Sequence, residues 1–182
     1  MKNIEVEVTG ISPLLQHRFP MEDSDQQSTA KNRKQKEDDV EKSLYRLEDG
    51  TIYQPCEHFI SSLKKAGAKY QIPGQGKATY KNLIGSGAVI ITPDAIPHKH
   101  QEFVIDARPV VIAATKGRIV RRRPMLRKWS LNFQIEFDED EISAATIKDL
   151  LEYAGRRVGI GDFRPERGGH FGRFMVSKFK QK

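Results

Sequence analysis

The sequence contains one cysteine, Cys56, and no long apolar segment. A single cysteine excludes an internal disulfide framework and a zinc site built from several cysteines, and a reducing cytoplasm is the expected location. No run of apolar residues approaches the length of a transmembrane helix, which is about 20 residues. The first residues, MKNIEVEVTG, lack the apolar core of a secretory signal. These absences predict a cytoplasmic protein that does not bind a membrane.

The length and charge of the chain indicate one basic domain. A chain of 182 residues can bury about 70% of its surface, which is enough for one hydrophobic core. We therefore expect a single domain over residues 1–182. Lys and Arg number 31 against 24 Asp and Glu, which gives a net charge of +7. This excess favours a polyanionic partner such as a nucleic acid.

Two periodicities predict an α+β fold. Helical spacing predicts one helix with Pro55 as its first residue, and a second that is capped by Ser143 and ended by Gly155. Alternating or short apolar runs predict strands at 4–8, 89–91, 103–113, 129–137 and 173–179. The order strand, helix, strand, strand, helix, strand is that of the ferredoxin-like (RRM-like) βαββαβ fold, an antiparallel sheet with two helices on one face.

Three segments do not fit this frame and are predicted as insertions. Residues 17–44 are almost free of apolar side chains and carry mixed charge, so they lack a core face. Residues 71–101 are rich in glycine and proline. Residues 113–128 connect two predicted strands and form a projecting basic hairpin.

The basic hairpin is the strongest electrostatic feature of the sequence. Seven cations and no acid occur in KGRIVRRRPMLRK, namely Lys116, Arg118, Arg121, Arg122, Arg123, Arg127 and Lys128. Like charges at this density repel unless an anion neutralises them. A single nucleic-acid strand does so and releases about 0.7 counterions per contacted phosphate. The alternative is a solvated surface hairpin.

A glycine-rich segment follows the second helix. In GRRVGIGDFRPERGGHFG, residues 155–172, arginines alternate with Phe163, His170 and Phe171. Glycines permit close approach of a ligand and can form an anion nest, and basic groups beside aromatic rings suit a single strand. The segment is not a P-loop because it lacks GK[ST]. The alternative is a long turn in which Asp162 pairs with an arginine and both phenylalanines are buried.

Three segments together resemble the CRISPR-associated RAMP superfamily, and specifically its backbone-type subunits. The first is IEVEVTGISPLL, which is similar to the first strand of that family. The second is YQPCEHFISSLKKAGAK, which resembles its entry into a basic helix, although Cys56 replaces the usual glycine. The third is AGRRVGIGDFRPERGGHFGRFMV, which resembles its glycine-rich segment.

The resemblance implies a guide-RNA-binding subunit that assembles side by side along a single-stranded RNA in a helical or filamentous array. It also implies other effector subunits and a complementary target strand as partners. The basic hairpin would serve as a thumb, with Met125 or Leu126 as a wedge between bases. The predicted RNA contacts are Arg18, Lys64, Lys65, Arg118, Arg121, Arg122, Arg123, Arg127, Arg156, Arg157, Phe163, Arg164, Arg167, His170 and Arg173.

We expect no enzymatic activity, no cofactor and no metal. Two alternatives remain open at this stage. One is a metal-independent endoribonuclease that processes guide RNA with His17 or His170 as general base. The resemblance separately implies that an aspartate of the first insertion could cut a target RNA, and Asp23, Asp25, Asp38 and Asp39 lie there without a motif that singles one out. The other is a phage-type protein that binds single-stranded DNA. The pair His98 and His100 lacks a third metal ligand nearby in the sequence.

Overall fold

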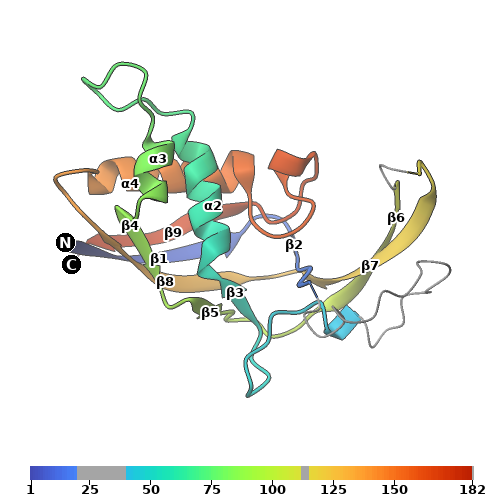
Figure 1. The fold of residues 1–182 in the computed structure, drawn as a ribbon. Coiled ribbons are helices and arrows are strands. Elements are labelled where there is room, and N and C mark those ends of the chain that lie inside the picture. Colours follow the sequence, from blue (N-terminus) through green and yellow to red (C-terminus); the bar gives the residue numbers. More distant parts are fainter. Residues whose placement is uncertain (20–39, 112–114, 182) are drawn as a thin grey trace, which may run out of the picture.

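The computed structural model describes residues 1–19, 40–111 and 115–181, and they form a mixed α+β structure with antiparallel sheets. The main sheet has the order β4-β8-β1-β9, and each strand is antiparallel to its neighbours (Figure 1). Its strands are β1 (Lys2–Gly10), β4 (Val89–Thr92), β8 (Ser130–Phe137) and β9 (Phe174–Gln181). The strands predicted at 4–8, 89–91, 129–137 and 173–179 therefore lie in one sheet.

Three helices cover one face of this sheet (Figure 1). They are α2 (Cys56–Gly67), α3 (Tyr80–Gly85) and α4 (Ala144–Tyr153). Pro55 lies one position before α2 rather than inside it. Ser143 caps α4 as predicted, because its hydroxyl accepts a hydrogen bond of 3.1 Å from the Thr146 amide. Gly155 does not end the helix, which continues as the π-helical turn η1 (Ala154–Val158).

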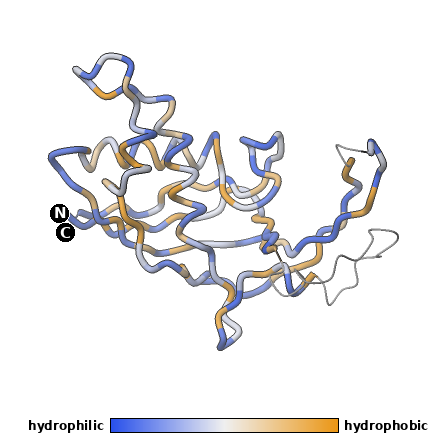
Figure 2. The backbone as a smooth tube through the Cα atoms, in the orientation of Figure 1, coloured by the Kyte–Doolittle hydropathy of each residue, from blue (hydrophilic) through white to orange (hydrophobic). Residues whose placement is uncertain are grey.

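The core lies between the sheet and the helices. Ile4, Val6 and Val8 point to this side and are fully buried, as the period of two in β1 predicts. The centres of the Phe59 ring of α2 and the Phe133 ring of β8 are 4.7 Å apart. The opposite face of the sheet carries charged side chains, and two of its acids pair with lysines, as in Glu5–Lys178 and Glu7–Lys99. Figure 2 shows the hydrophilic and hydrophobic residues that alternate along these strands.

A hairpin extends away from the helices and forms its own sheet (Figure 1). Strands β6 (Val104–Val111) and β7 (Arg118–Leu126) pair along their length, and the short β2 (Leu14–Leu15) joins β7 at the base. The predicted boundaries of 113–128 are corrected, since the hairpin begins at Val104 and Arg127 follows its last residue. Leu126 is fully buried at this base. It therefore cannot be a wedge between bases.

The interval 71–101 is not an insertion throughout. It contains α3, the sheet strand β4 and the short β5 (Ala95–Pro97), which pairs with β3 (Tyr53–Pro55). Val89 and Ile91 of β4 are buried in the core, so part of this interval belongs to the body of the fold. The interval 17–44 ends in core residues as well, because Val40 and Leu44 are buried. Residues 20–39, with Asp23, Asp25, Asp38 and Asp39, lie outside the described residues.

Candidate nucleic-acid interface

The base of the hairpin and the glycine-rich segment are in direct contact. The Arg123 guanidinium is buried and donates a hydrogen bond of 2.8 Å to Asp162. On the neighbouring strand, the Arg108 guanidinium lies 4.6 Å from the centre of the Phe171 ring. Two regions far apart in sequence therefore meet at this point. Arg123 itself is a correction to the predicted RNA contacts, since it is an internal ion-pair partner.

The glycine-rich segment is held tightly against β2. Gly172 has a φ of 66°, and a Cβ there would lie 1.8 Å from the Ile160 carbonyl oxygen. The Gly172 amide donates a hydrogen bond to the Pro13 carbonyl, and the Asp162 amide donates one to the Leu15 carbonyl. The Ile160 and Phe171 amides also donate to backbone carbonyls. These N–H groups are used inside the protein, so the predicted nest of amides for an anion is not formed by them, and the segment presents side chains instead.

A groove separates this segment from α2. It consists of two adjoining hollows of about 210 and 190 Å³, which share His58, Gly161 and Arg164. Lys65 and Ser61 extend it along α2, and His17 and Tyr45 line its other end. His58, Ser61 and Lys65 fall on one side of α2 because they are spaced by three and four positions. That spacing was the available signal for His58, which the sequence prediction missed.

The groove has more cations than acids. The Glu166 carboxylate pairs with Lys65, with Arg164 at 2.8 Å and with Arg167 at 3.9 Å. Partial burial would raise the pKa of Glu166, but the Lys65 hydrogen bond and the surrounding cations outweigh it and lower the pKa. The Arg164 guanidinium also donates a hydrogen bond of 2.9 Å to the Gly161 carbonyl, which fixes the direction of the Arg164 side chain. Asp162 is a second acid of the groove, and it pairs with Arg123. The two carboxylates therefore face four cations in and around the groove, which leaves an excess of positive charge.

The surroundings of the two histidines of the groove favour their neutral form. Burial lowers the pKa of His58, and the nearby Arg164 lowers it further. Partial burial also lowers the pKa of His17; Asp162 opposes this effect, while Arg121 and Arg123 reinforce it. The His58 ring is oriented by a hydrogen bond with the Gln54 side chain. Both imidazoles can therefore act as hydrogen-bond partners without adding charge.

Several predicted residues lie away from this groove. Lys64 packs against Gly85 of α3, so of the two candidate lysines Lys65 alone lines it. His170 stacks on Phe171, with 4.3 Å between the ring centres. Phe163 is 37% exposed and lies beside Arg123. Along the hairpin, Arg118 is exposed, and Arg121 and Arg122 are half-buried. Three further predicted contacts are also exposed, namely Arg18 after β2, Arg127 after β7 and Arg167 in the glycine-rich segment.

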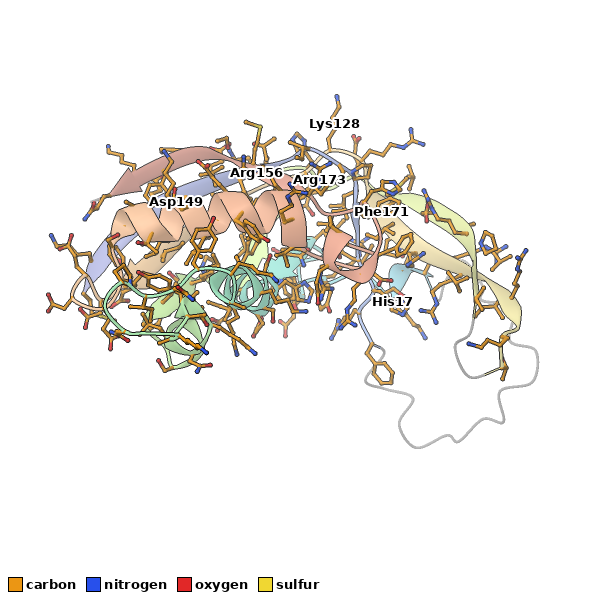
Figure 3. The ribbon with its side chains drawn as sticks, turned by 90° about the horizontal axis from the view of Figure 1, so that it is seen from above. His17, Lys128, Asp149, Arg156, Phe171 and Arg173 are labelled. Atoms are coloured by element: carbon orange, nitrogen blue, oxygen red, sulfur yellow. The ribbon has the colours of Figure 1, made fainter. Side chains whose placement is uncertain are left out.

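Arg156, Arg157 and Arg173 form a separate group. Together with Tyr153 they surround a hollow of about 500 Å³ at the end of α4. Figure 3 shows Arg156 and Arg173 on one long edge of the molecule and His17 on the other. The predicted cations thus occupy two surfaces rather than one. Across residues 1–19, 40–111 and 115–181, no three His, Cys, Asp or Glu side chains are grouped to hold a metal, and no helix there could cross a membrane.

The chain is similar to a known protein in structure, but it matches none by sequence. No protein-family model and no curated protein sequence matches the chain. Among solved structures, it resembles a chain of the type III-B Cmr-β complex, determined by cryo-electron microscopy with cognate target RNA bound, with a TM-score of 0.59 and 15% identity. The match covers 99% of this chain and 60% of that one, so this chain spans less than two thirds of its length. At this identity the likeness establishes a shared fold.

Proposed function

We propose that this protein is an RNA-binding subunit of a CRISPR-type ribonucleoprotein effector, of the backbone type. It binds guide RNA without reading sequence and associates with further copies along the RNA. The order β4-β8-β1-β9, with α2 and α4 on one face, supports a ferredoxin-like core. The fold shared with a chain of an RNA-bound Cmr complex supports the class of assembly.

The groove between α2 and the glycine-rich segment is the observation that carries this proposal. Lys65 and Arg164 are positioned on its two walls, and His17 lies at the end nearest the hairpin. Arginine matches phosphate geometry with two parallel hydrogen bonds, and lysine supplies a point charge. Beyond this end of the groove, Phe163 is 37% exposed, and Arg121 of β7 is close enough to His17 to act on its charge.

The same groove explains binding without sequence preference. Its cations interact with phosphates, which are identical in every nucleotide. Phe163 offers an aromatic face, and stacking on it tolerates any base and contributes about 1–3 kcal/mol. The polar face of the main sheet is less suited to RNA, because Glu5 and Glu7 lie on it and pair with lysines.

The proposal is tested by the affinity for a labelled single-stranded RNA of mixed sequence, measured at several salt concentrations. Lys65→Ala with Arg164→Ala should reduce affinity for every sequence and decrease the salt slope by about 0.7 for each lost phosphate contact. Lys180→Ala on β9 removes the same type of charge outside the groove and should change neither quantity. An unchanged slope in the groove variant would contradict the proposal. Equal affinity for DNA of the same sequence would favour the single-stranded DNA-binding alternative, because 2′-OH contacts distinguish RNA.

One observation favours a second candidate function, metal-independent RNA cleavage. His17, Tyr45 and His58 line the same hollow beside Arg164. A neutral imidazole there could accept the proton of a ribose 2′-OH as general base, and the Tyr45 phenol could give a proton to the leaving oxygen as general acid. His170, the other predicted base, is stacked on Phe171 instead. RNA that is cut by the wild type, but bound and left intact by His17→Ala and His58→Ala, would establish this activity. Intact RNA after prolonged incubation with the wild type would exclude it.

A further inference from the structure

The charged side chains that form the arginine hollow at the end of α4 are all of one sign. Arg156 and Arg157 are exposed, and Arg173 is half-buried between them and the loop after β1. Among the described residues, none of these three guanidinium groups forms an ion pair with a carboxylate. Three unneutralised cations around one hollow repel each other, and an anionic group placed among them removes that repulsion.

The backbone holds these arginines in fixed positions. A Cβ on Gly155 would lie 2.2 Å from the Phe174 carbonyl oxygen, so η1 packs directly against β9. The Arg156 Nε donates a hydrogen bond of 3.3 Å to the Glu152 carbonyl. The Arg173 amide donates a hydrogen bond of 3.0 Å to the Ser12 hydroxyl, and the Arg173 carbonyl accepts one of 2.9 Å from the Ile11 amide. The backbone that carries these arginines is therefore fixed, which reduces part of the entropy cost of binding.

The chemistry of the hollow favours carboxylates over a nucleic-acid strand. Tyr153 is its aromatic side chain, and its ring already packs edge-on against Tyr70, with 5.7 Å between centres. The lining of the hollow is thus three arginines and one tyrosine already engaged in packing, so charge rather than stacking dominates its chemistry. The groove on the other edge differs, since Phe163, the residue next to its lining residues Asp162 and Arg164, is 37% exposed.

A matching set of carboxylates lies at the opposite end of α4. Residues 138–141 read DEDE and connect β8 to this helix. Glu139 pairs with Lys2 at 3.1 Å, while Asp138, Asp140 and Glu141 have no cation partner among the described residues. A helix of 10 residues spans about 15 Å. The acidic loop of one molecule therefore cannot reach its own arginine hollow.

We propose that the hollow formed by Arg156, Arg157 and Arg173 binds the 138–141 loop of a second copy of this chain. Three arginines then face three carboxylates. The contact joins two different surfaces, so it is head-to-tail and repeats from copy to copy. The inference rests on the self-association in the proposed function and assigns the surfaces that carry it. It leaves the RNA groove open, because that groove lies on the other edge.

The test uses two charge-reversed proteins and sedimentation velocity. Variant A carries Arg156→Glu and Arg157→Glu, and variant B carries Asp140→Lys and Glu141→Lys. The wild type should self-associate at low ionic strength and dissociate as salt is added. Each variant alone should associate at least about tenfold more weakly. An equal mixture should regain association, because the acidic hollow of A fits the basic loop of B, and the unchanged surfaces also match.

The other outcomes separate this proposal from that of RNA binding. The inference is overturned if the wild type stays monomeric at low salt, or if the mixture of A and B does not associate more strongly than either variant alone. Loss of RNA affinity in A with normal affinity in B, and no complementation, would make the hollow an RNA site instead. Lys65→Ala with Arg164→Ala serves as the control. It should weaken RNA binding while leaving association in the absence of RNA unchanged, so failure of the groove and failure of this interface give different results.

Discussion

Arg123 differs from the other cations of the hairpin because it is buried. Its side chain packs beside Phe163, and its guanidinium neutralises Asp162. Burial alone would raise the pKa of Asp162, but the hydrogen bond and charge of Arg123 outweigh it and lower the pKa. The neighbouring Arg121 shares the strand but is half-buried and contacts no carboxylate among those described. Two arginines spaced by two positions on one strand therefore have different surroundings: Arg123 is paired inside the protein, whereas Arg121 has no such carboxylate partner among the described residues.

Arg123→Ala is expected to destabilise the protein. It leaves the Asp162 carboxylate without its partner and opens space beside Phe163. Losing one partner of a fully buried pair costs about 3–5 kcal/mol, and we expect about 2 kcal/mol because Asp162 is partly exposed. Chemical denaturation measures the change. Arg121→Ala is the control and should cost under about 0.5 kcal/mol. Equal losses from the two variants would contradict this assignment.

His98 makes stability depend on pH. Burial lowers the pKa of His98 from 6.5 to about 3, and its Nδ1 has no hydrogen-bond partner among the described residues. The unfolded chain therefore binds a proton below pH 6.5 that the folded protein does not. Stability is complete above that pH and falls as the pH decreases toward 3, by up to about 1.4 kcal/mol per pH unit.

The measurement is the free energy of unfolding at pH 7 and pH 5, where the wild type should lose about 2 kcal/mol through His98. His17 and His58 also have lowered pKa values and add to the loss. His98→Gln removes the His98 contribution, so the variant should show a smaller difference between the two pH values. An identical difference in both proteins would show that His98 is not the titrating group.

At the scale of elements, the glycine-rich segment acts as a rigid connector. It lies against β2 through the Asp162 and Gly172 amides and positions Arg164 on the groove. The 3-10 turn η2 (Pro165–Arg167) follows, and Gly168 ends it with a φ of 79°. Glycine is needed in this segment for two different reasons, a left-handed backbone at some positions and close approach of another chain segment at others.

Gly168 and Gly169 provide a matched test of these reasons. A Cβ on Gly169 would lie 1.7 Å from the Phe163 carbonyl oxygen, whereas a Cβ on Gly168 meets no atom within 4 Å. Gly168→Ala should cost about 1–2 kcal/mol through its left-handed backbone alone. Gly169→Ala should cost more and also lower RNA affinity, since the backbone around Phe163 must move. Denaturation and RNA titration of both variants measure this, and equal effects would refute the distinction.

At the scale of the whole molecule, the hairpin and the body are distinct parts joined at one base. Arg108, Arg123 and β2 hold that base. Beyond it, Val111, Ile119 and Val120 are each more than two fifths exposed. Exposed apolar side chains beside arginines on a projecting ribbon are unusual for a surface without a ligand. We therefore expect the distal hairpin to serve binding rather than folding.

Replacement of residues 109–120 by Asn-Gly tests this expectation. The new turn joins Arg108 and Arg121, which are paired across the strands, and Asn-Gly suits a two-residue hairpin connection. The contacts of the base remain. We expect the free energy of unfolding to stay within about 0.5 kcal/mol of the wild type and RNA affinity to fall. Loss of stability with unchanged affinity would give the distal hairpin a structural role instead.

Local pattern determined the elements of this protein. Alternation in β1 and β8, the Ser143 cap and the helical spacing after Pro55 are properties of neighbouring residues, so the sequence alone predicted these strands and helices. The net charge and the basic stretch likewise pointed to a polyanion. The π-helical continuation through Gly155 was missed because tight packing against Phe174 of β9, a distant segment, favours it.

The placement of the charges was decided by the tertiary structure. The sequence did not show that Arg123 would meet Asp162, that Lys65 rather than Lys64 would face the groove, or that Arg156 and Arg173 would lie on the other edge. The physical reason is that charge and periodicity belong to single residues and short segments, whereas burial and pairing depend on which distant segments the sheet register brings together. Strand β1, for example, pairs with β9 at the far end of the chain, and this register fixes both basic surfaces.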